Sequence, residues 1–433
     1  MALNIKEAAA KMKQDSSKMA ALSVDVRNNA LKSVRDALVA NKDQIFAVNK
    51  EDIDAAEEAG ISEAVKKRLK FDEHKLEDVV AGIEGLISLP DPIGKLQLAR
   101  ELDKDLVLKR YSCPIGVIGI IFEARPDALI QISSLCIKSG NCAILKGGKE
   151  TARTNKTLFD IIYKTVTEAG LPENCLLQAE LHNEIDELLQ CHESVDLLIP
   201  RGSNAFVQYI MNNTKIPVMG HADGICHTYV DKDVDIDKML PVIVDAKTQY
   251  TAACNATETL LVHKDIAEEV LPKIADALKA AGVKLRGTRD AALIIDGMIG
   301  NDDIMGNDDF KTEYLDMIIS VKLVESVDEA IAHINRFGSH HTDCILTEND
   351  DTAEHFMQLV DSAGVYQNCS TRFADGFRYG FGAEVGISTG KIHARGPVGL
   401  EGLVTYKYKL FGKGHTVNDY ATGVKKFNFV DLQ

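Results

Sequence analysis

The chain has 433 residues, enough for two or three domains, and its 45% hydrophobic and 26% charged residues are typical of a globular protein. The formal net charge of −16, without a basic stripe, argues against nucleic-acid binding, and no apolar run reaches the length of a membrane span. Nine cysteines lack a CxxC pair and no apolar signal core opens the chain, so we expect a cytoplasmic protein with reduced thiols.

The first 90 residues predict helices, because Leu31, Val34 and Leu38 fall on one helical face with charged residues opposite. Residues 91–94 end this pattern. Residues 95–109 then alternate about a turn at 102–104, which predicts a β-hairpin with a polar face. An exposed hairpin can pair with the sheet edge of another subunit, so we expect a homo-oligomer of two or more copies.

From Gly116 onward, short apolar runs alternate with helical segments, a pattern that predicts a parallel sheet covered by helices on both faces. A second α/β series begins near residue 245, and the last twenty residues carry no signal. The expected strands are 117–122, 143–145, 176–177, 195–199, 216–218, 260–262, 292–295, 344–346 and 365–366. The expected helices of the first series are 127–139, 150–168, 183–191 and 203–212.

Two strand-to-helix turns have the composition of anion-binding loops, in which backbone N–H groups and the helix dipole face a phosphate. Neither turn matches GxGxxG or the Walker lysine loop, and each alone could be an ordinary connection. Two such turns in one sheet favour dinucleotide binding. The first contains Lys146, Gly147, Gly148 and Lys149, and the second contains Arg201, Gly202 and Ser203.

Cys254 is the candidate nucleophile, because it lies among small residues just before an apolar, strand-like run. Arg125, at the end of a buried strand, is a candidate for holding an anionic substrate, or else forms a salt bridge with Glu123 or Asp127. Arg372 and Arg395 lie in cationic stretches that could equally be solvated surface.

Two further features favour structural interpretations. His221, Asp223, Cys226 and His227 lie within eight residues, but no second ligand cluster accompanies them, so we expect no metal site. Glu258 could serve as a base for the thiol, although strand alternation favours a structural hydrogen bond.

The order of several motifs closely resembles the gamma-glutamyl phosphate reductase family, a proline-biosynthetic branch of the aldehyde dehydrogenase superfamily, over about residues 5–412. Some details, such as Asp127 after Arg-Pro, resemble the reductase half of pyrroline-carboxylate synthases. The motifs are Phe-Glu-Ala-Arg-Pro (122–126), Leu-Lys-Gly-Gly-Lys-Glu (145–150), Pro-Arg-Gly-Ser (200–203), Gly-His-Ala-Asp-Gly-Ile-Cys-His (220–227), Ala-Ala-Cys-Asn-Ala (252–256), Glu-Tyr-Leu-Asp (313–316), Ala-Glu-Val-Gly-Ile-Ser-Thr (383–389) and His-Ala-Arg-Gly-Pro (393–397).

The resemblance implies an α/β fold with a Rossmann-type parallel-sheet cofactor domain, an α/β catalytic domain and a small β oligomerisation element. We place the dinucleotide-binding domain at 1–94 and 114–244 and the catalytic domain at 245–395. The oligomerisation strands and C-terminal tail are expected at 95–113 and 396–433.

The resemblance also assigns roles to single residues. Cys254 matches the nucleophile, and its backbone N–H would help to stabilise an oxyanion. Lys146 matches the lysine at the adenosine ribose, Ser203 the small residue at the pyrophosphate, and Glu313 the acid at the nicotinamide ribose. The candidates for substrate binding are Arg125, His221, Asn255, Arg372 and Arg395, with His393 behind them.

Two departures from the wider superfamily refine the expected chemistry. Met219 stands about where hydrolytic aldehyde dehydrogenases carry a glutamate base, so a thioester would be protected from water. Lys149 stands where they carry a ribose-binding glutamate, which favours NADPH over NADH. The implied reaction is NADPH-dependent reduction of L-glutamyl 5-phosphate to L-glutamate 5-semialdehyde through a Cys254 thioester, with glutamate 5-kinase as a separate protein.

Three alternatives remain at this point: a hydrolytic NAD(P)-dependent aldehyde dehydrogenase, a non-catalytic protein that has kept the fold, and a cofactor-free thiol acyltransferase or hydrolase. Met219 argues against the first, and the combination of Cys254 with both anion loops argues against the other two.

Overall fold

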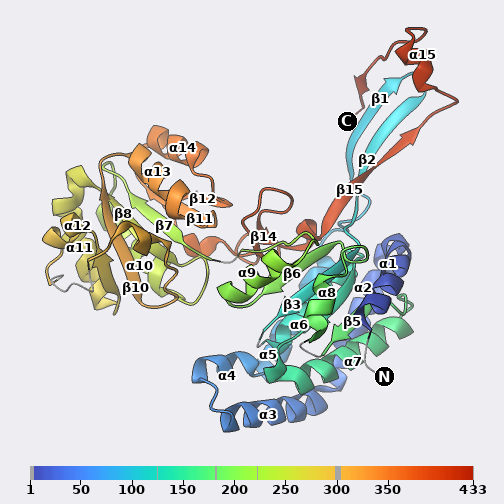
Figure 1. Cartoon of the computed structure of the whole chain (residues 1–433), viewed down its shortest axis with the longest axis horizontal. Coiled ribbons are helices and arrows are strands. Elements are labelled where there is room, and N and C mark those ends of the chain that lie inside the picture. The colour runs from blue at the N-terminus through green and yellow to red at the C-terminus, as the bar shows by residue number, and fades with distance from the viewer. Residues whose placement is uncertain (1–3, 124, 181–182, 222, 298–303, 433) are drawn as a thin grey trace. The chain divides into compact units, whose positions relative to one another are not determined.

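The computed structural model describes residues 4–123, 125–180, 183–221, 223–297 and 304–432, without the side chains of residues 63, 64, 183, 307 and 308. The chain divides into two units, each described by itself (Figure 1). Unit 1 consists of Met1–Met219, Phe381–Gly386 and Val398–Gln433, and unit 2 of Gly220–Gly380 and Ile387–Pro397. Residues 220–244, which we expected in the dinucleotide-binding domain, therefore belong to unit 2.

Unit 1 begins with the expected helices. The side chain of Asn4 caps the first helix by accepting the Glu7 N–H, and Leu31, Val34 and Leu38 are fully buried on one face of the second. The helices are α1 (Ile5–Ala21), α2 (Val24–Ala40), α3 (Lys42–Glu58), α4 (Glu63–Leu69) and α5 (Glu73–Ser88).

A four-stranded parallel sheet with the order β5-β4-β3-β6 forms the centre of unit 1. Every residue of β3 is buried, as expected for a strand covered on both faces. Its strands are β3 (Val117–Phe122), β4 (Cys142–Lys146), β5 (Leu176–Ala179) and β6 (Leu197–Arg201). The connecting helices are α6 (Pro126–Lys138), α7 (Ala152–Glu168), α8 (Asn183–Leu189) and α9 (Asn204–Asn213), with the short 3-10 helix η1 (Lys149–Thr151) before α7.

A second sheet of unit 1, with the order β15-β2-β1-β16, contains the expected hairpin. The C-terminal residues, which carried no signal in the sequence, add a helix and the strand that pairs with β1. Such a short polar strand forms only through its hydrogen bonds to a partner strand, so local sequence does not predict it. The elements are β1 (Leu96–Asp103), β2 (Leu106–Pro114), η5 (Leu400–Leu403), β15 (Val404–Phe411), α15 (Val417–Ala421) and β16 (Val430–Asp431).

Unit 2 is built around a six-stranded parallel sheet with the order β12-β11-β7-β8-β10-β9. The strands are β7 (Cys226–Val230), β8 (Thr257–His263), β9 (Lys284–Gly287), β10 (Ile318–Val324), β11 (Thr342–Leu346) and β12 (Gly364–Gln367). The helices are α10 (Ile236–Thr248), α11 (Lys264–Ala280), α12 (Arg289–Ile294), η3 (Asn307–Lys311), α13 (Val327–Phe337), α14 (Asp350–Leu359) and η4 (Thr371–Phe373). The strands β13 (Gly386–Ser388) and β14 (Gly396–Val398) form a separate ribbon.

Three sequence predictions differ from the structure. Residues 292–295 were expected in a strand but lie in and after α12, because periodicity does not separate a short apolar strand from a short helix. Residues 216–218 contribute only a single bridge between Leu198 and Val218. In the unit 2 sheet, the strands β7, β9 and β10 were not among the expected strands.

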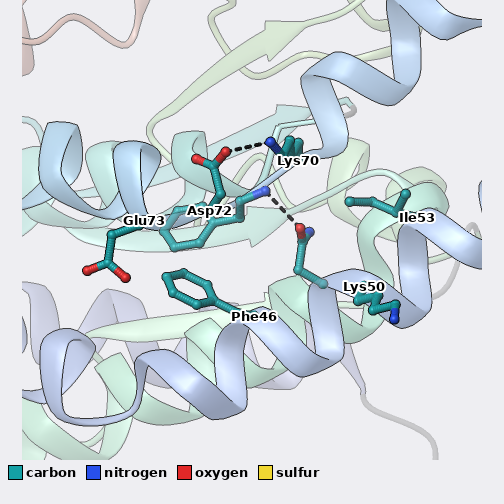
Figure 2. Close-up of a pocket in the computed structure, with 8 residues that line it drawn as sticks. Phe46, Lys50, Ile53, Lys70, Asp72 and Glu73 are labelled. Atoms are coloured by element: carbon teal, nitrogen blue, oxygen red, sulfur yellow. Dashed lines mark hydrogen bonds and ion pairs between the residues drawn. The ribbon is translucent and has the colours of Figure 1, made fainter.

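A pocket of about 440 Å³ lies in unit 1 between α3 and the start of α5, lined by Phe46, Lys50, Phe71 and Asp72 among others (Figure 2). It contains neither a thiol nor an imidazole. None of the described helices combines the length and apolar content that a bilayer crossing requires.

Candidate active site

The sulfur of Cys254 lies at the amino edge of the unit 2 sheet, in the loop between α10 and β8. The strands β7, β8 and β11 are parallel, so their first residues meet at this edge. The backbone of Gly224 packs directly against that of Cys254, because a Cβ on Gly224 would lie 2.1 Å from the Cys254 carbonyl oxygen. Close backbone packing therefore fixes the position of the nucleophile.

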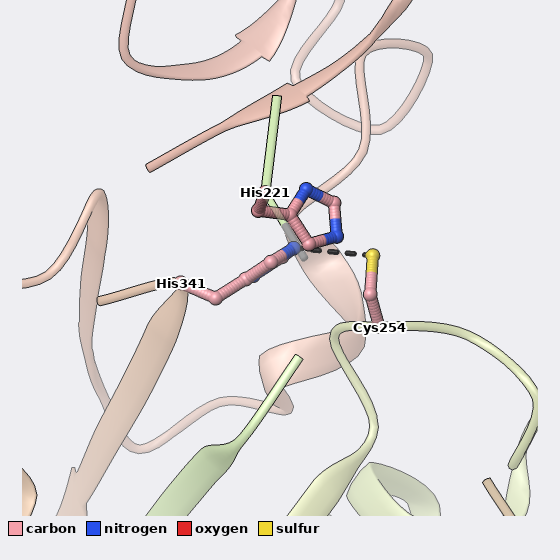
Figure 3. Close-up of side chains that lie close together, drawn as sticks. All are labelled: His221, Cys254 and His341. Carbon is pink, nitrogen blue, oxygen red and sulfur yellow. Dashed lines mark hydrogen bonds between the residues drawn. The ribbon is translucent and has the colours of Figure 1, made fainter. Parts of the chain in front are cut away.

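His341 is the direct partner of the thiol. Its Nε2 lies 3.2 Å from Cys254 Sγ, and its Nδ1 lies 2.9 Å from Thr342 Oγ1 (Figure 3). The His341 side chain is fully buried immediately before β11, where the strand holds it in place. The sequence analysis did not select this residue. The only signal was a pair of histidines, His340 and His341, directly before a predicted strand.

His221 completes a cluster of three side chains. Its ring lies edge-on to the ring of His341 at a centroid distance of 4.9 Å, and one of its ring nitrogens faces the sulfur (Figure 3). His221 Nδ1 lies 2.8 Å from the carbonyl oxygen of Ile387. A carbonyl only accepts hydrogen bonds, so Nδ1 of His221 carries a proton.

Arg372 provides positive charge near the thiol. The residue is 7% exposed, and its Nε donates to Gln249 Oε1 at 2.9 Å. Burial and the nearby Arg378 lower the pKa of Arg372, whereas the electrostatic attraction of Cys254 opposes this shift. An anion bound next to Cys254 would therefore offset the cost of burying the positive charge of Arg372.

Two other predicted substrate residues in unit 2 have protein partners. The Asn255 amide donates to the carbonyl oxygen of Ala374 at 2.9 Å, and its side chain is buried. Arg395 donates to the Asp361 carboxylate at 3.1 Å. Contacts of Asn255 and Arg395 with a substrate stay predictions of the sequence.

A buried ion pair supports the start of β8. Lys247 Nζ donates to Glu258 Oε2 at 2.7 Å, with both side chains almost fully buried, and the Leu315 N–H donates to Glu258 Oε1 at 3.2 Å. Burial raises the pKa of Glu258 to about 7, while Lys247 lowers it and Glu313 raises it. Glu258 thus makes the structural hydrogen bonds that strand alternation indicated, and these link β8 to the segment that contains Glu313.

The histidine and cysteine residues of the motif 220–227 do not form one site. His221 faces Cys254, whereas His227 Nδ1 lies 2.8 Å from Asp343 in the core, and Cys226 donates to the Cys254 carbonyl oxygen at 3.3 Å. Ala222 of this motif and Ala124 of the motif 122–126 lie outside the described residues.

Both predicted anion loops lie at the carboxyl edge of the unit 1 sheet. Strand β3 pairs with β4 on one side and β6 on the other, so the chain order reverses at β3, where ligands of open α/β sheets bind. Lys146 is 6% exposed and its Nζ donates to the Gly147 carbonyl oxygen at 2.7 Å. Lys149 is exposed at the start of η1.

An acidic side chain, that of Glu123 after β3, lies against the turn after β6 that was predicted to bind a phosphate. A Cβ on Gly202 would lie 2.9 Å from Glu123 Oε2, and the backbone of Ser203 forms a hydrogen bond with Glu123 that lowers its pKa. Burial of the carboxyl group and, to a smaller extent, the negative charge of Glu150 raise the pKa of Glu123, so the pKa is raised overall. Arg125, at the start of α6, is exposed and also belongs to unit 1.

Similarity to known proteins identifies the family to which this chain belongs. The model of the "Aldehyde dehydrogenase family" matches residues 2–300. A gamma-glutamyl phosphate reductase of Acetivibrio thermocellus is 53% identical over 425 residues, which covers 98% of this chain and 97% of that protein. A protein of the same name from Picosynechococcus sp. is 53% identical over 433 residues and 100% of both chains.

A crystal structure of gamma-glutamyl phosphate reductase from Thermotoga maritima superimposes with a TM-score of 0.92 at 36% identity, covering 96% of this chain and 100% of that one. This chain therefore belongs to the aldehyde dehydrogenase family of nicotinamide-dependent oxidoreductases and, within it, to the gamma-glutamyl phosphate reductases. The predicted α/β aldehyde dehydrogenase-like fold is confirmed.

Proposed function

We propose that the chain catalyses the NADPH-dependent reduction of L-glutamyl 5-phosphate to L-glutamate 5-semialdehyde and phosphate, in the biosynthesis of proline, through a thioester on Cys254. The observation that carries the covalent mechanism is the 3.2 Å contact between Cys254 Sγ and His341 Nε2 in a buried setting. The substrate follows from the names and the identity of the relatives.

The first step is acyl transfer to sulfur. His341 Nε2 accepts the thiol proton, and the Cys254 thiolate attacks the acyl carbon of the substrate. The bond from that carbon to the phosphate oxygen breaks, and phosphate leaves with its electron pair. Arg372 offsets the negative charge of the phosphate or of the developing oxyanion, which is a stronger interaction in a desolvated site.

The cofactor would be held by the loops that follow β4 and β6 in unit 1. These loops fit a dinucleotide, because they follow the two strands that flank β3, where the chain order of the sheet reverses. The residues that would hold it are Lys146, Gly147, Gly148, Lys149, Arg201, Gly202, Ser203 and Glu313. When bound, NADPH supplies the hydride that converts the thioester to a thiohemiacetal.

Release of the product regenerates the nucleophile. The thiohemiacetal oxygen re-forms the carbonyl, the carbon–sulfur bond breaks, and the sulfur leaves as a thiolate beside the protonated His341. None of these reaction steps activates water, since Met219, at the position of the glutamate base in hydrolytic aldehyde dehydrogenases, has no basic group. The reductase relatives likewise do not favour the hydrolytic alternative.

Assembly and location complete the proposal. The sheet β15-β2-β1-β16 exposes aromatic side chains such as Tyr406, Tyr408 and Phe429, which supports a homo-oligomer of two or more copies. The acyl phosphate would come from a separate glutamate 5-kinase, and we place the enzyme in the cytoplasm.

The test is the reverse reaction, NADP⁺ reduction with glutamate 5-semialdehyde, measured with and without inorganic phosphate for wild type and Cys254→Ser. We expect strict dependence on phosphate and loss of activity in the variant. Turnover without phosphate would show hydrolysis instead, and an active Cys254→Ser variant would refute the covalent step. Parallel assays with NAD⁺ measure the cofactor preference attributed to Lys149.

A further inference from the structure

The nucleophile Cys254 and two histidines beside it form a set of metal-binding atoms that the reduction does not use in full. The mechanism needs Cys254 and His341, whereas His221 takes part in no step. Nevertheless, one ligand atom from each of His221, Cys254 and His341 lies within 4.8 Å of the other two (Figure 3). Two imidazoles and a thiolate are ligands that Zn²⁺ and related cations prefer.

The spacing of these atoms is close to that of a tetrahedral site. Zinc–sulfur bonds of about 2.3 Å and zinc–nitrogen bonds of about 2.0–2.1 Å place ligand atoms roughly 3.4–3.6 Å apart at tetrahedral angles. The contact between Cys254 Sγ and His341 Nε2 is 3.2 Å, and no pair exceeds 4.8 Å. Small side-chain rotations would therefore bring all three atoms to a common centre.

Outer hydrogen bonds orient both imidazoles as in metal sites. His221 Nδ1 donates to the Ile387 carbonyl oxygen, and the other ring nitrogen, Nε2, points to the side of the sulfur. His341 Nδ1 lies 2.9 Å from Thr342 Oγ1, which leaves its Nε2 directed at Cys254. A ligating histidine almost always has such a partner on its second nitrogen, which fixes the tautomer and the ring.

We propose that His221, Cys254 and His341 form a site for a soft divalent cation of the Zn²⁺ class, and that the bound cation reversibly inhibits the enzyme. The cation displaces the thiol proton to solvent and bonds to the thiolate, His221 Nε2 and His341 Nε2. Three protein ligands leave a fourth position to water. The lone pair needed to attack an acyl carbon is then engaged with the metal, so the cation competes with the substrate.

Metal binding is measured first without turnover. Co²⁺ added to the full chain should give a thiolate-to-metal charge-transfer absorption in wild type, and Cys254→Ser should lose it. Zn²⁺ should slow the alkylation of Cys254 by iodoacetamide, and a chelator should restore the rate. Absence of the Co²⁺ band in wild type, or its persistence in Cys254→Ser, would overturn the proposal.

The contribution of His221 distinguishes a three-ligand site from a metal bound to the thiol alone. His221→Ala should weaken Zn²⁺ binding, measured as protection from alkylation, by about 10–100-fold. Cys113→Ser, which removes a half-buried thiol of unit 1, is the matched control and should bind Zn²⁺ like wild type. Equal Zn²⁺ protection in His221→Ala and wild type would refute the site. Circular dichroism checks that each variant is folded.

Discussion

The nucleophile end of unit 2 and the proposed cofactor loops of unit 1 both lie at edges of parallel sheets, but they are built differently. In unit 2, Cys254 is held by backbone packing against Gly224 and by a buried imidazole. In unit 1, the turn after β6 consists of small residues, and the carboxylate of Glu123 lies against it.

The contrast reflects what each region must do. Covalent catalysis requires the sulfur and its base within hydrogen-bond distance before the substrate arrives, because misplacement by about 1 Å can cost roughly 100-fold in rate. A cofactor that binds and leaves needs backbone surfaces and charges that can exchange partners. We therefore expect substitutions at the nucleophile end to affect kcat, and substitutions in the cofactor loops to affect KM for the cofactor.

The largest effect is expected for His341→Gln, which keeps the size of the side chain but removes the base. We expect kcat/KM to fall by about 10²–10⁴-fold, the contribution typical of a general base. The control is His355→Gln, at a surface histidine that contacts Asp328. Steady-state kinetics and the alkylation rate of Cys254 measure the loss. Near-normal alkylation and turnover in His341→Gln would remove His341 from the mechanism.

Gly224→Ala tests the packing that fixes the sulfur. The added methyl would lie 2.1 Å from the Cys254 carbonyl oxygen, so the nucleophile loop must move. We expect about a 100-fold loss of kcat and a loss of stability of about 1–3 kcal/mol. Gly390→Ala is the control, because its methyl meets only Ser388 Oγ at 3.7 Å. Wild-type kinetics in Gly224→Ala would show that the loop is not fixed by this contact.

The buried pair under β8 gives stability a defined pH dependence. Burial raises the pKa of Glu258 from 4.5 to about 7, so between these values the folded state holds a proton that the unfolded state has lost. Stability from this group is therefore present below pH 4.5 and is lost as pH rises through about 7. This pH dependence follows from the linkage between proton binding and folding.

Urea unfolding of wild type and Glu258→Gln at several pH values measures this dependence. The difference between the two free energies of unfolding should change across pH 5–7.5, with wild type losing stability relative to the variant as pH rises. A constant difference would mean that Lys247 keeps Glu258 ionised throughout this range, despite its burial.

The smallest effect is expected in unit 1, for Glu123→Gln. The carboxylate lies against Gly202 and bonds to the backbone of Ser203, where it opposes a bound phosphate. Removing its charge at the start of α9 should lower KM for NADPH about two- to five-fold, in line with helix-terminus charge effects of about 0.3–1 kcal/mol. Glu173→Gln, at an exposed site of unit 1, should leave KM unchanged. A higher KM in Glu123→Gln would mean that Glu123 helps to hold the cofactor.

The sequence predicted features that are contiguous in the chain. Helical periodicity placed Leu31 and Val34 in the core, and apolar runs placed β3 and β8 within a few residues of their ends. It failed for residues 292–295, where a run of four apolar residues is compatible with strand or helix, and tertiary packing selected the helix.

The amino-acid sequence by itself determined the family and indicated the candidate nucleophile and the two glycine-containing loops, because each is a short motif whose chemistry depends on neighbouring residues. Only the tertiary structure decided the partner of the nucleophile. His341 lies 87 positions from Cys254 and meets it because β8 and β11, on either side of β7, begin at the same sheet edge. The same holds for His221 and for the Lys247–Glu258 pair. Such contacts arise from strand order and burial, which no local pattern encodes.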